Sequence, residues 1–197
     1  MPFVDFTALT APTAADLDIV SRQGMMVFAT AADRNSQLSG VLAEGMFCFT
    51  KDDDSVYYYD GSNWVTYTSP EITYTPTWQN FTPGALSTVA ASYQWLPGLR
   101  LACWGQVTIG SDGSVDGNVK GVLPLSQSAG ASGATGSSLQ NDVGTRIYNG
   151  FSHCIPGATV FDFHHAESGN GGVVNATNPF TWTTGDVFTW DIQVAVT

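Results

Sequence analysis

The sequence predicts an all-β protein in which a small N-terminal meander, built around a β-hairpin and with room for a short helix, precedes a jelly-roll-like β-sandwich. Three observations support this prediction. Charged residues make up only 12% of the chain, against about a quarter in an average domain. Glycine is frequent, with 21 residues among 197. Short segments of alternating apolar and polar residues recur along the chain, separated by Gly, Pro, Asn and Asp.

The chain divides near Pro70 into a head, residues 1–70, and a body, residues 71–197. Pro70 and Pro76 bracket a short polar stretch that is typical of an extended linker or an edge strand. The chain is long enough for one ordinary domain or two small ones, and 43% hydrophobic residues supply a core in either case.

Three segments of the head predict regular structure. The segment "PTAADLDIVSRQ", residues 12–23, predicts a short helix, because Thr13 can cap its first turn. The segments "GMMVF", residues 24–28, and "GMFCF", residues 45–49, share a Gly-Met-x-x-Phe pattern, and each predicts a strand that starts after a turn glycine.

The segment "DDDSVYYYDGSNWVTY", residues 52–67, carries the strongest local signal. Asp60-Gly61 separates an aromatic run from a second run that starts at Trp64, which predicts a β-hairpin. Aromatic pairs across a hairpin contribute about 0.2–1 kcal/mol each, so we interpret these rings as packing groups in preference to a ligand platform.

The body contains further strand signals. In two segments, 99–109 and 187–196, apolar side chains alternate with polar ones, which predicts strands with one buried side. The segment 126–144 is rich in Gly and Ser with few apolar side chains, and it predicts a long loop. Further strands are predicted at 89–96, 114–123, 146–151, 158–164 and 172–177.

The charge balance excludes several classes of function. The net charge is −11, from 17 acidic against 6 basic residues, so the chain has no basic stripe that could neutralise phosphates. Nucleic-acid binding is therefore not expected, and neither is insertion into a membrane, since no apolar run reaches about 18 residues. The N-terminal segment lacks the pattern of a secretory signal, which favours assembly in a cytoplasm.

The segment "DGSVDGN" matches the first half of a calcium-binding loop. Asp112, Ser114, Asp116 and Gly117 have the required spacing, but Leu123 stands where a bidentate Glu is needed. The flanking residues also read as strands, so we predict a tight turn without calcium.

Histidines and acidic residues near residue 160 could form a metal or acid–base site: His153, His164 and His165, with Asp162 and Glu167. His164 and His165 are adjacent, so on a strand they point to opposite faces and cannot easily share one ion. We therefore predict no metal. No nucleophile motif such as Gly-x-Ser-x-Gly is present, and we predict neither an enzyme nor a cofactor.

The cysteines Cys48, Cys103 and Cys154 are odd in number and widely spaced, without a Cys-x-x-Cys pair. This pattern favours neither a disulfide framework nor a zinc site. We interpret them as small buried apolar residues.

Three segments resemble proteins of tailed bacteriophages. They are "GMFCFTKDDDSVYYYDGSNWV", residues 45–65, "YTPTWQNFT", residues 74–82, and "NPFTWTTGDVFTWDIQVAV", residues 178–196. They are similar to segments of minor tail or fibre proteins, and of head-decoration proteins, from phages that infect actinobacteria.

The resemblance implies a homotrimer that is a structural component of the virion. The head would attach it to other virion proteins of the tail or capsid, and the body would be displayed outward. The sequence has no collagen-like repeat or coiled-coil shaft, so the resemblance implies a short appendage.

The alternative hypothesis is a carbohydrate-binding module that recognises a host cell-surface glycan. In that case an exposed aromatic side chain would stack on the sugar, and the candidates are Trp78, Trp95, Trp104 and Trp182. An aromatic residue on a concave exposed surface would favour this alternative, whereas burial of all four would favour a purely structural protein.

Overall fold

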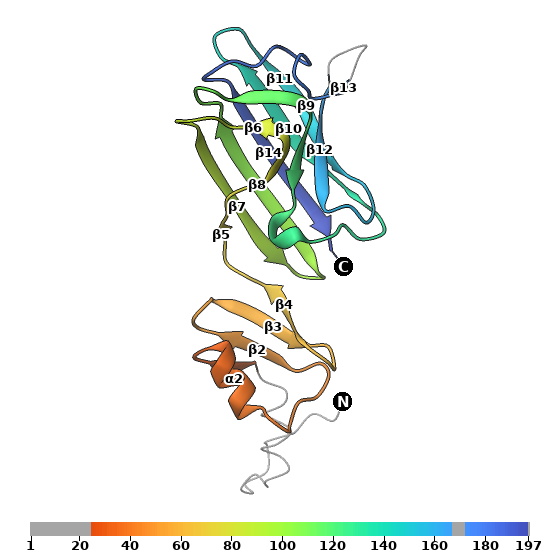
Figure 1. Cartoon of the computed structure of the whole chain (residues 1–197). Helices are drawn as coiled ribbons and strands as arrows, with labels where there is room; N and C mark the ends of the chain where they lie inside the picture. Colours follow the sequence, from red (N-terminus) through yellow and green to blue (C-terminus); the bar gives the residue numbers. More distant parts are fainter. Residues whose placement is uncertain (1–24, 167–171, 197) are drawn as a thin grey trace, which may run out of the picture. The chain divides into compact units, whose positions relative to one another are not determined.

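In a computed structural model, which describes residues 25–166 and 172–196, the chain forms two compact units, Met1–Pro70 and Glu71–Thr197 (Figure 1). Both units are built mainly from β-strands, and the prediction of an all-β sandwich protein is confirmed. No helix within the described ranges has the length and apolar character needed to cross a bilayer.

The smaller unit contains a four-stranded sheet with the strand order β1-β2-β3-β4. The pair β1 and β2 is parallel, and the two following pairs are antiparallel. Each of the two Gly-Met segments contains a strand, as predicted, and the two strands are neighbours in the sheet. The elements are β1 (Met26–Phe28), α2 (Ala31–Gln37), β2 (Phe47–Thr50), β3 (Ser55–Tyr59) and β4 (Trp64–Thr68).

Helix α2 is a short element that the sequence analysis did not anticipate. The hydroxyl of Thr30 accepts a hydrogen bond from the backbone N–H of Asp33 at 3.0 Å, and the Asp33 carboxylate accepts one from the N–H of Ala29 at 3.2 Å. These two contacts satisfy backbone donors at the start of the helix. The helix predicted at residues 12–23 lies outside the described residues.

The predicted hairpin is confirmed, with a four-residue connection between Tyr59 and Trp64. The rings of these two residues pair at 5.4 Å, and Tyr58 packs edge-on to Tyr67 on the other side. The guanidinium of Arg34, which is only 5% exposed, lies 5.0 Å and 4.8 Å from the rings of Tyr57 and Trp64. The aromatic run thus packs within its own unit, and a buried cation joins helix α2 to the hairpin.

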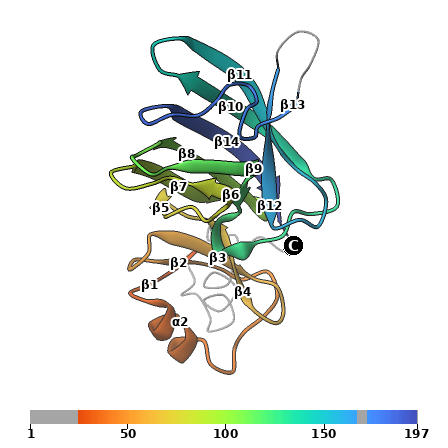
Figure 2. The ribbon, with the colours of Figure 1, turned by 45° about the horizontal axis from the view of Figure 1, so that its top comes forward.

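The larger unit is one ten-stranded sheet that curls into a sandwich, with the order β5-β7-β8-β14-β10-β11-β12-β9-β6 and β13 beside β12. Figure 2 follows the succession from β7 to β11 along one layer and the return through β12 and β9. The strands are β5 (Ile72–Thr73), β6 (Trp78–Thr82), β7 (Thr88–Leu96), β8 (Arg100–Thr108), β9 (Ser114–Val122), β10 (Ala134–Asp142), β11 (Arg146–Cys154), β12 (Val160–His165), β13 (Gly172–Val173) and β14 (Val187–Ala195), with a 3-10 turn η1 (Pro124–Ser126).

Aromatic side chains fill the space between the two layers. The ring of Trp78 on β6 meets the ring of Trp190 on β14 edge-to-face at 5.1 Å, and Phe163 on β12 meets Phe188 in the same way at 4.2 Å. Such edge-to-face pairs add about 0.5–1.5 kcal/mol beyond the area they bury. The core of the sandwich is therefore a cross-layer aromatic cluster.

The prediction of a long loop at 126–144 is wrong, because strand β10 lies inside this segment and pairs with both β11 and β14. Its inward positions carry small or polar residues, namely Gly136, Ser138 and Gln140. A Cβ at Gly136 would lie 1.9 Å from the backbone oxygen of Asp191, so only glycine fits. These inward positions carry no large apolar side chain because the rings of Trp190 and Phe188 on the neighbouring strand already fill the interior.

Most other predicted strands are present with shifted ends. The predicted strand 146–151 extends to Cys154, and the predicted strand 172–177 is reduced to the two residues of β13. The segments 89–96, 99–109, 114–123 and 158–164 correspond closely to β7, β8, β9 and β12. Alternation of apolar residues was therefore a reliable signal for β8, and the Gly, Pro, Asn and Asp residues between the other segments marked their limits.

We predict that Gly105→Ala destabilises the larger unit by about 1–3 kcal/mol, the usual cost of overpacking a core. A Cβ at this position would lie 2.5 Å from the ring of Trp190 and 2.8 Å from the carbonyl oxygen of Ala90. Urea unfolding followed by circular dichroism measures the change. Gly117→Ala is the matched control, since its nearest neighbour is the Asn80 side chain at 3.4 Å. Equal stability of the two variants would contradict the prediction.

Candidate functional site

The outer face of the larger sheet carries a continuous row of side chains across its strands. In register, Ser92 on β7 lies opposite Trp104 on β8, Trp104 opposite Asp191 on β14, and Asp191 opposite Ser137 on β10. Because side chains on directly paired residues share one face, these four point away from the core. The sequence periodicity that buries the neighbouring residues thus also aligns this outer row.

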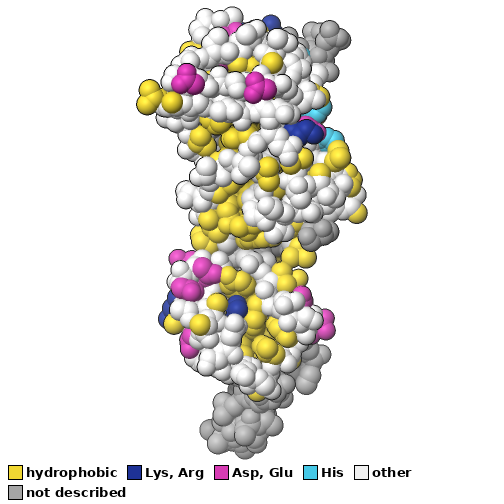
Figure 3. All heavy atoms as spheres, in the orientation of Figure 1, with side chains coloured by type: hydrophobic (Ala, Val, Ile, Leu, Met, Phe, Trp, Pro, Cys, Tyr) yellow, Lys and Arg dark blue, Asp and Glu magenta, His cyan; other side chains and the backbone are white. Residues whose placement is uncertain are grey.

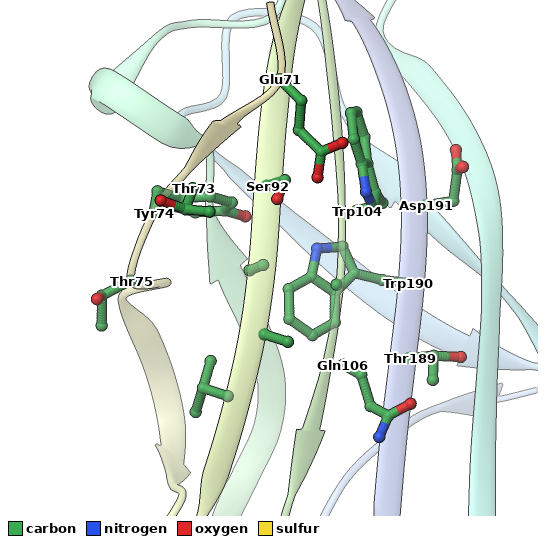
Figure 4. A pocket seen from close by; sticks show the side chains of 14 residues that line it. Glu71, Thr73, Tyr74, Thr75, Ser92, Trp104, Gln106, Thr189, Trp190 and Asp191 are labelled. Atoms are coloured by element: carbon green, nitrogen blue, oxygen red, sulfur yellow. The ribbon is translucent and has the colours of Figure 1, made fainter.

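A concavity of about 830 Å³ lies over β7, β8 and β14, with the segment that contains β5 as one wall (Figure 4). Its size is within the usual range for small-molecule sites. Glu71, Trp104 and Asp191 lie at the same end of the concavity in this view, and Gln106 and Thr189 lie at the other. We call this concavity the outer cleft.

The outer cleft is hollow because small residues form its floor. Its floor is formed along β7 and β8 by Ala90, Ser92 and Gly105, where no large side chain stands above the sheet. Trp190 packs against the core side of Gly105 and closes the floor from below. The indole ring of Trp104 lies beside carboxylate, amide and hydroxyl groups. It gives the cleft one flat apolar surface with hydrogen-bonding groups around it.

The four tryptophans that are candidates for stacking on a sugar lie in different surroundings in the structure. Trp78, Trp95 and Trp182 pack against the core cluster of the sandwich. Trp104 is half-buried on the opposite side of its sheet and lines the outer cleft. Alternation in "LACWGQV" could have shown that Trp104 faces away from the core, but not that the surface around it is concave.

The histidines near residue 160 are divided between the two faces of β12. His165 is 3% exposed and points inward, whereas His164 and Asp162 point outward. His153 on β11 lies directly opposite Asp162. The possible ligand atoms of His153, Asp162 and His164 all lie within 4.8 Å of one another. Glu167 lies outside the described residues.

Two neighbours order this outward histidine cluster. The ring of Phe151 stacks on that of His164 with centroids 4.7 Å apart and an angle of 1° between the planes. The Lys120 ammonium lies 3.3 Å from the Asp162 carboxylate. Partial burial lowers the pKa of His164 below its usual value, so this imidazole is neutral near pH 7.

The segment that resembles a calcium loop is a turn between β8 and β9, as predicted. Asp112 adopts a positive φ of 63°, and strand β9 begins at Ser114, whose hydroxyl donates to the Asp116 carboxylate at 3.0 Å. Among the described residues, side chains that could hold a metal ion come together at His153, Asp162 and His164 and not at this turn.

The three cysteines are free and buried, in agreement with their interpretation as apolar core residues. Cys48 belongs to the core of the smaller unit, and Cys103 and Cys154 belong to the sandwich core. Burial raises the pKa of Cys103 to about 12 and that of Cys154 to about 11. Burial raises the pKa of Cys48 as well, so all three thiols are poor nucleophiles at neutral pH.

Comparisons with known proteins give one structural similarity. No family model matches the chain, and no curated protein matches it. The chain is similar in structure to part of the crystal structure of the Dettilon tailspike protein, with 13% sequence identity and a TM-score of 0.48 over 65% of this chain. The matched region covers 24% of that tailspike protein.

We predict that iodoacetamide does not label the cysteines of the native protein at pH 8. Their raised pKa values keep the thiols protonated, and their burial excludes the reagent. Intact-mass spectrometry measures the labelling, and the protein unfolded in guanidinium chloride is the control that should take up three labels. Fast labelling of the native chain would show that at least one thiol is accessible.

Proposed function

We propose that the chain is a non-enzymatic structural protein of a phage virion. It forms a short trimeric appendage that attaches to the tail or capsid through residues 1–70 and displays the sandwich outward. The proposal rests on the positions, within the structure, of the segments that resemble phage virion proteins. Residues 74–82 and 178–196 are about a hundred positions apart, yet their aromatic rings pack together as Trp78 against Trp190 at 5.1 Å and Trp78 against Phe188 at 6.3 Å.

Exposed apolar side chains support assembly with other chains. Phe47 on the smaller unit is 41% exposed, and Ile147 on the sandwich is 56% exposed. Figure 3 shows apolar side chains on the visible surface of both units. Contact with another protein would cover apolar side chains of this kind and remove them from water.

A second candidate function is recognition of a host glycan, and the outer cleft favours it. Trp104 is the tryptophan that faces the concave surface, and Glu71 and Asp191 line the same cleft. An indole ring offers a flat apolar face to the C–H groups of a sugar ring, while nearby carboxylates accept hydrogen bonds from its hydroxyls. An appendage that displays the sandwich outward can carry both functions.

We expect purified protein to have a mass three times that of the 20.9 kDa chain when measured by multi-angle light scattering. A closed trimer is a common symmetric assembly and would cover part of the exposed apolar surface. In parallel, the chain should be detected by mass spectrometry in purified virions of the phage that encodes it. Its absence from virions would overturn the proposal, whereas a monomer in solution together with its presence in virions would overturn only the trimer.

We expect Trp104→Ala to weaken binding to host cell-wall glycans on a glycan array. Loss of one stacking ring should weaken binding by about tenfold or more, since an aromatic contact in a binding site contributes on the order of 1–2 kcal/mol. Trp95→Phe is the matched control, because Trp95 packs against the core. Binding that is not weakened in Trp104→Ala, or no binding by the unchanged protein, would exclude the outer cleft as a glycan site.

A further inference from the structure

We propose that His153, Asp162 and His164 form a binding site for one divalent transition-metal ion, such as Zn²⁺, on the outer face of the larger unit. The proposal is independent of the proposed function. It replaces the prediction from sequence, which compared the adjacent His164 and His165 and did not consider the strand that pairs with them.

Strand pairing brings the three side chains together. His153 on β11 is in register with Asp162 on β12, and His164 follows two positions later on the same outward face. Directly opposed residues in antiparallel strands have Cβ atoms about 4.5–5.5 Å apart, close enough for side chains to share one ion. The site is therefore built on two hydrogen-bonded strands and requires no loop to close over it.

The separation of the ligand atoms fits an open site. All three lie within 4.8 Å of one another, and metal bonds of about 2.0–2.2 Å place neighbouring ligand atoms about 3–3.5 Å apart. Small rotations of the side chains are enough to close the difference for any pair that lies near this upper limit. Three protein ligands on a partly exposed face leave the remaining coordination positions to water.

The residue types select the kind of metal. Two imidazoles and one carboxylate favour zinc, nickel, cobalt, copper or ferrous iron over calcium and magnesium, which prefer oxygen ligands. The stack of Phe151 on His164 fixes the orientation of one imidazole before any metal binds. Ordering a ligand in advance reduces the entropy that binding has to overcome.

Lys120 is the group that competes with the metal. Its ammonium lies 3.3 Å from the Asp162 carboxylate, with both side chains partly exposed at 33% and 26%. Figure 3 shows histidine side chains beside a basic side chain at one edge of the larger unit. An ion pair exposed to this degree is weak, so a divalent ion can displace the lysine from the carboxylate.

Isothermal titration calorimetry of the untagged chain, stripped with EDTA and titrated with Zn²⁺, tests the proposal. We expect one Zn²⁺ per chain and a rise in the thermal unfolding temperature on binding. Loss of a residue that only orients a metal ligand costs about 10–100-fold in affinity, so His153→Ala and His164→Ala should each weaken binding by at least about tenfold. Asp112→Asn is the matched control for Asp162→Asn. It removes the same charge, but at an exposed turn, and should leave the affinity for Zn²⁺ unchanged.

Lys120→Met provides a test that does not depend on a destabilised variant. Removal of the competing ammonium should tighten Zn²⁺ binding, while Co²⁺ substitution should give visible absorption bands that both histidine variants lose. No heat of Zn²⁺ binding by the unchanged chain would overturn the proposal. Unchanged affinity in both histidine variants, or one ion per three chains, would also overturn it, because the ion would then lie elsewhere or between copies.

Discussion

The sandwich depends on the contact between Trp78 and Trp190 across its two layers. These rings meet edge-to-face at 5.1 Å, and a glycine stands where the Trp190 ring meets the neighbouring strand β8. Gly105 lies directly against the Trp190 ring, and Gly121 lies in the same way against the ring of Phe161. Interiors are packed as densely as organic crystals, so a large ring at one position requires the absence of a side chain at the position that faces it. The aromatic cluster therefore dictates where glycine must stand in β8 and β9.

The same constraint shapes the outer face, because residues on a strand alternate between its two faces. Trp190 occupies the inward position of β14, so its neighbour Asp191 must point outward, in register with Trp104 of β8. The small residues of β7 and β8 then leave this part of the outer face hollow. On β12, inward Phe161 and Phe163 likewise require Asp162 and His164 to point outward. The outer cleft and the histidine cluster are thus both consequences of how the core is filled.

Apolar alternation was enough to predict β8 and β14, where apolar residues fill most of the inward positions. It failed for β10, because the inward Ser138 and Gln140 are paired with Trp190 and Phe188 of β14, whose rings fill the interior. The strand is therefore buried by residues that lie elsewhere in the chain. Helix α2 carried a local signal in Thr30 and Asp33 that was overlooked. The histidine cluster could not be found by spacing within one segment, since it depends on the register between β11 and β12.

The outer face also limits how copies of the sandwich can assemble. Trp104 and His164 lie in one cross-strand row, joined through Asp191, Ser137 and Phe151. An interface that covered this row would bury Asp191, and a buried carboxylate without a partner costs several kcal/mol. Exposed apolar residues elsewhere, such as Leu125 at 61% and Ile155 at 53%, lack this cost. If copies associate through apolar positions that lie outside this row, the outer cleft and the histidine cluster both remain open to solvent, and assembly is compatible with binding at either of them.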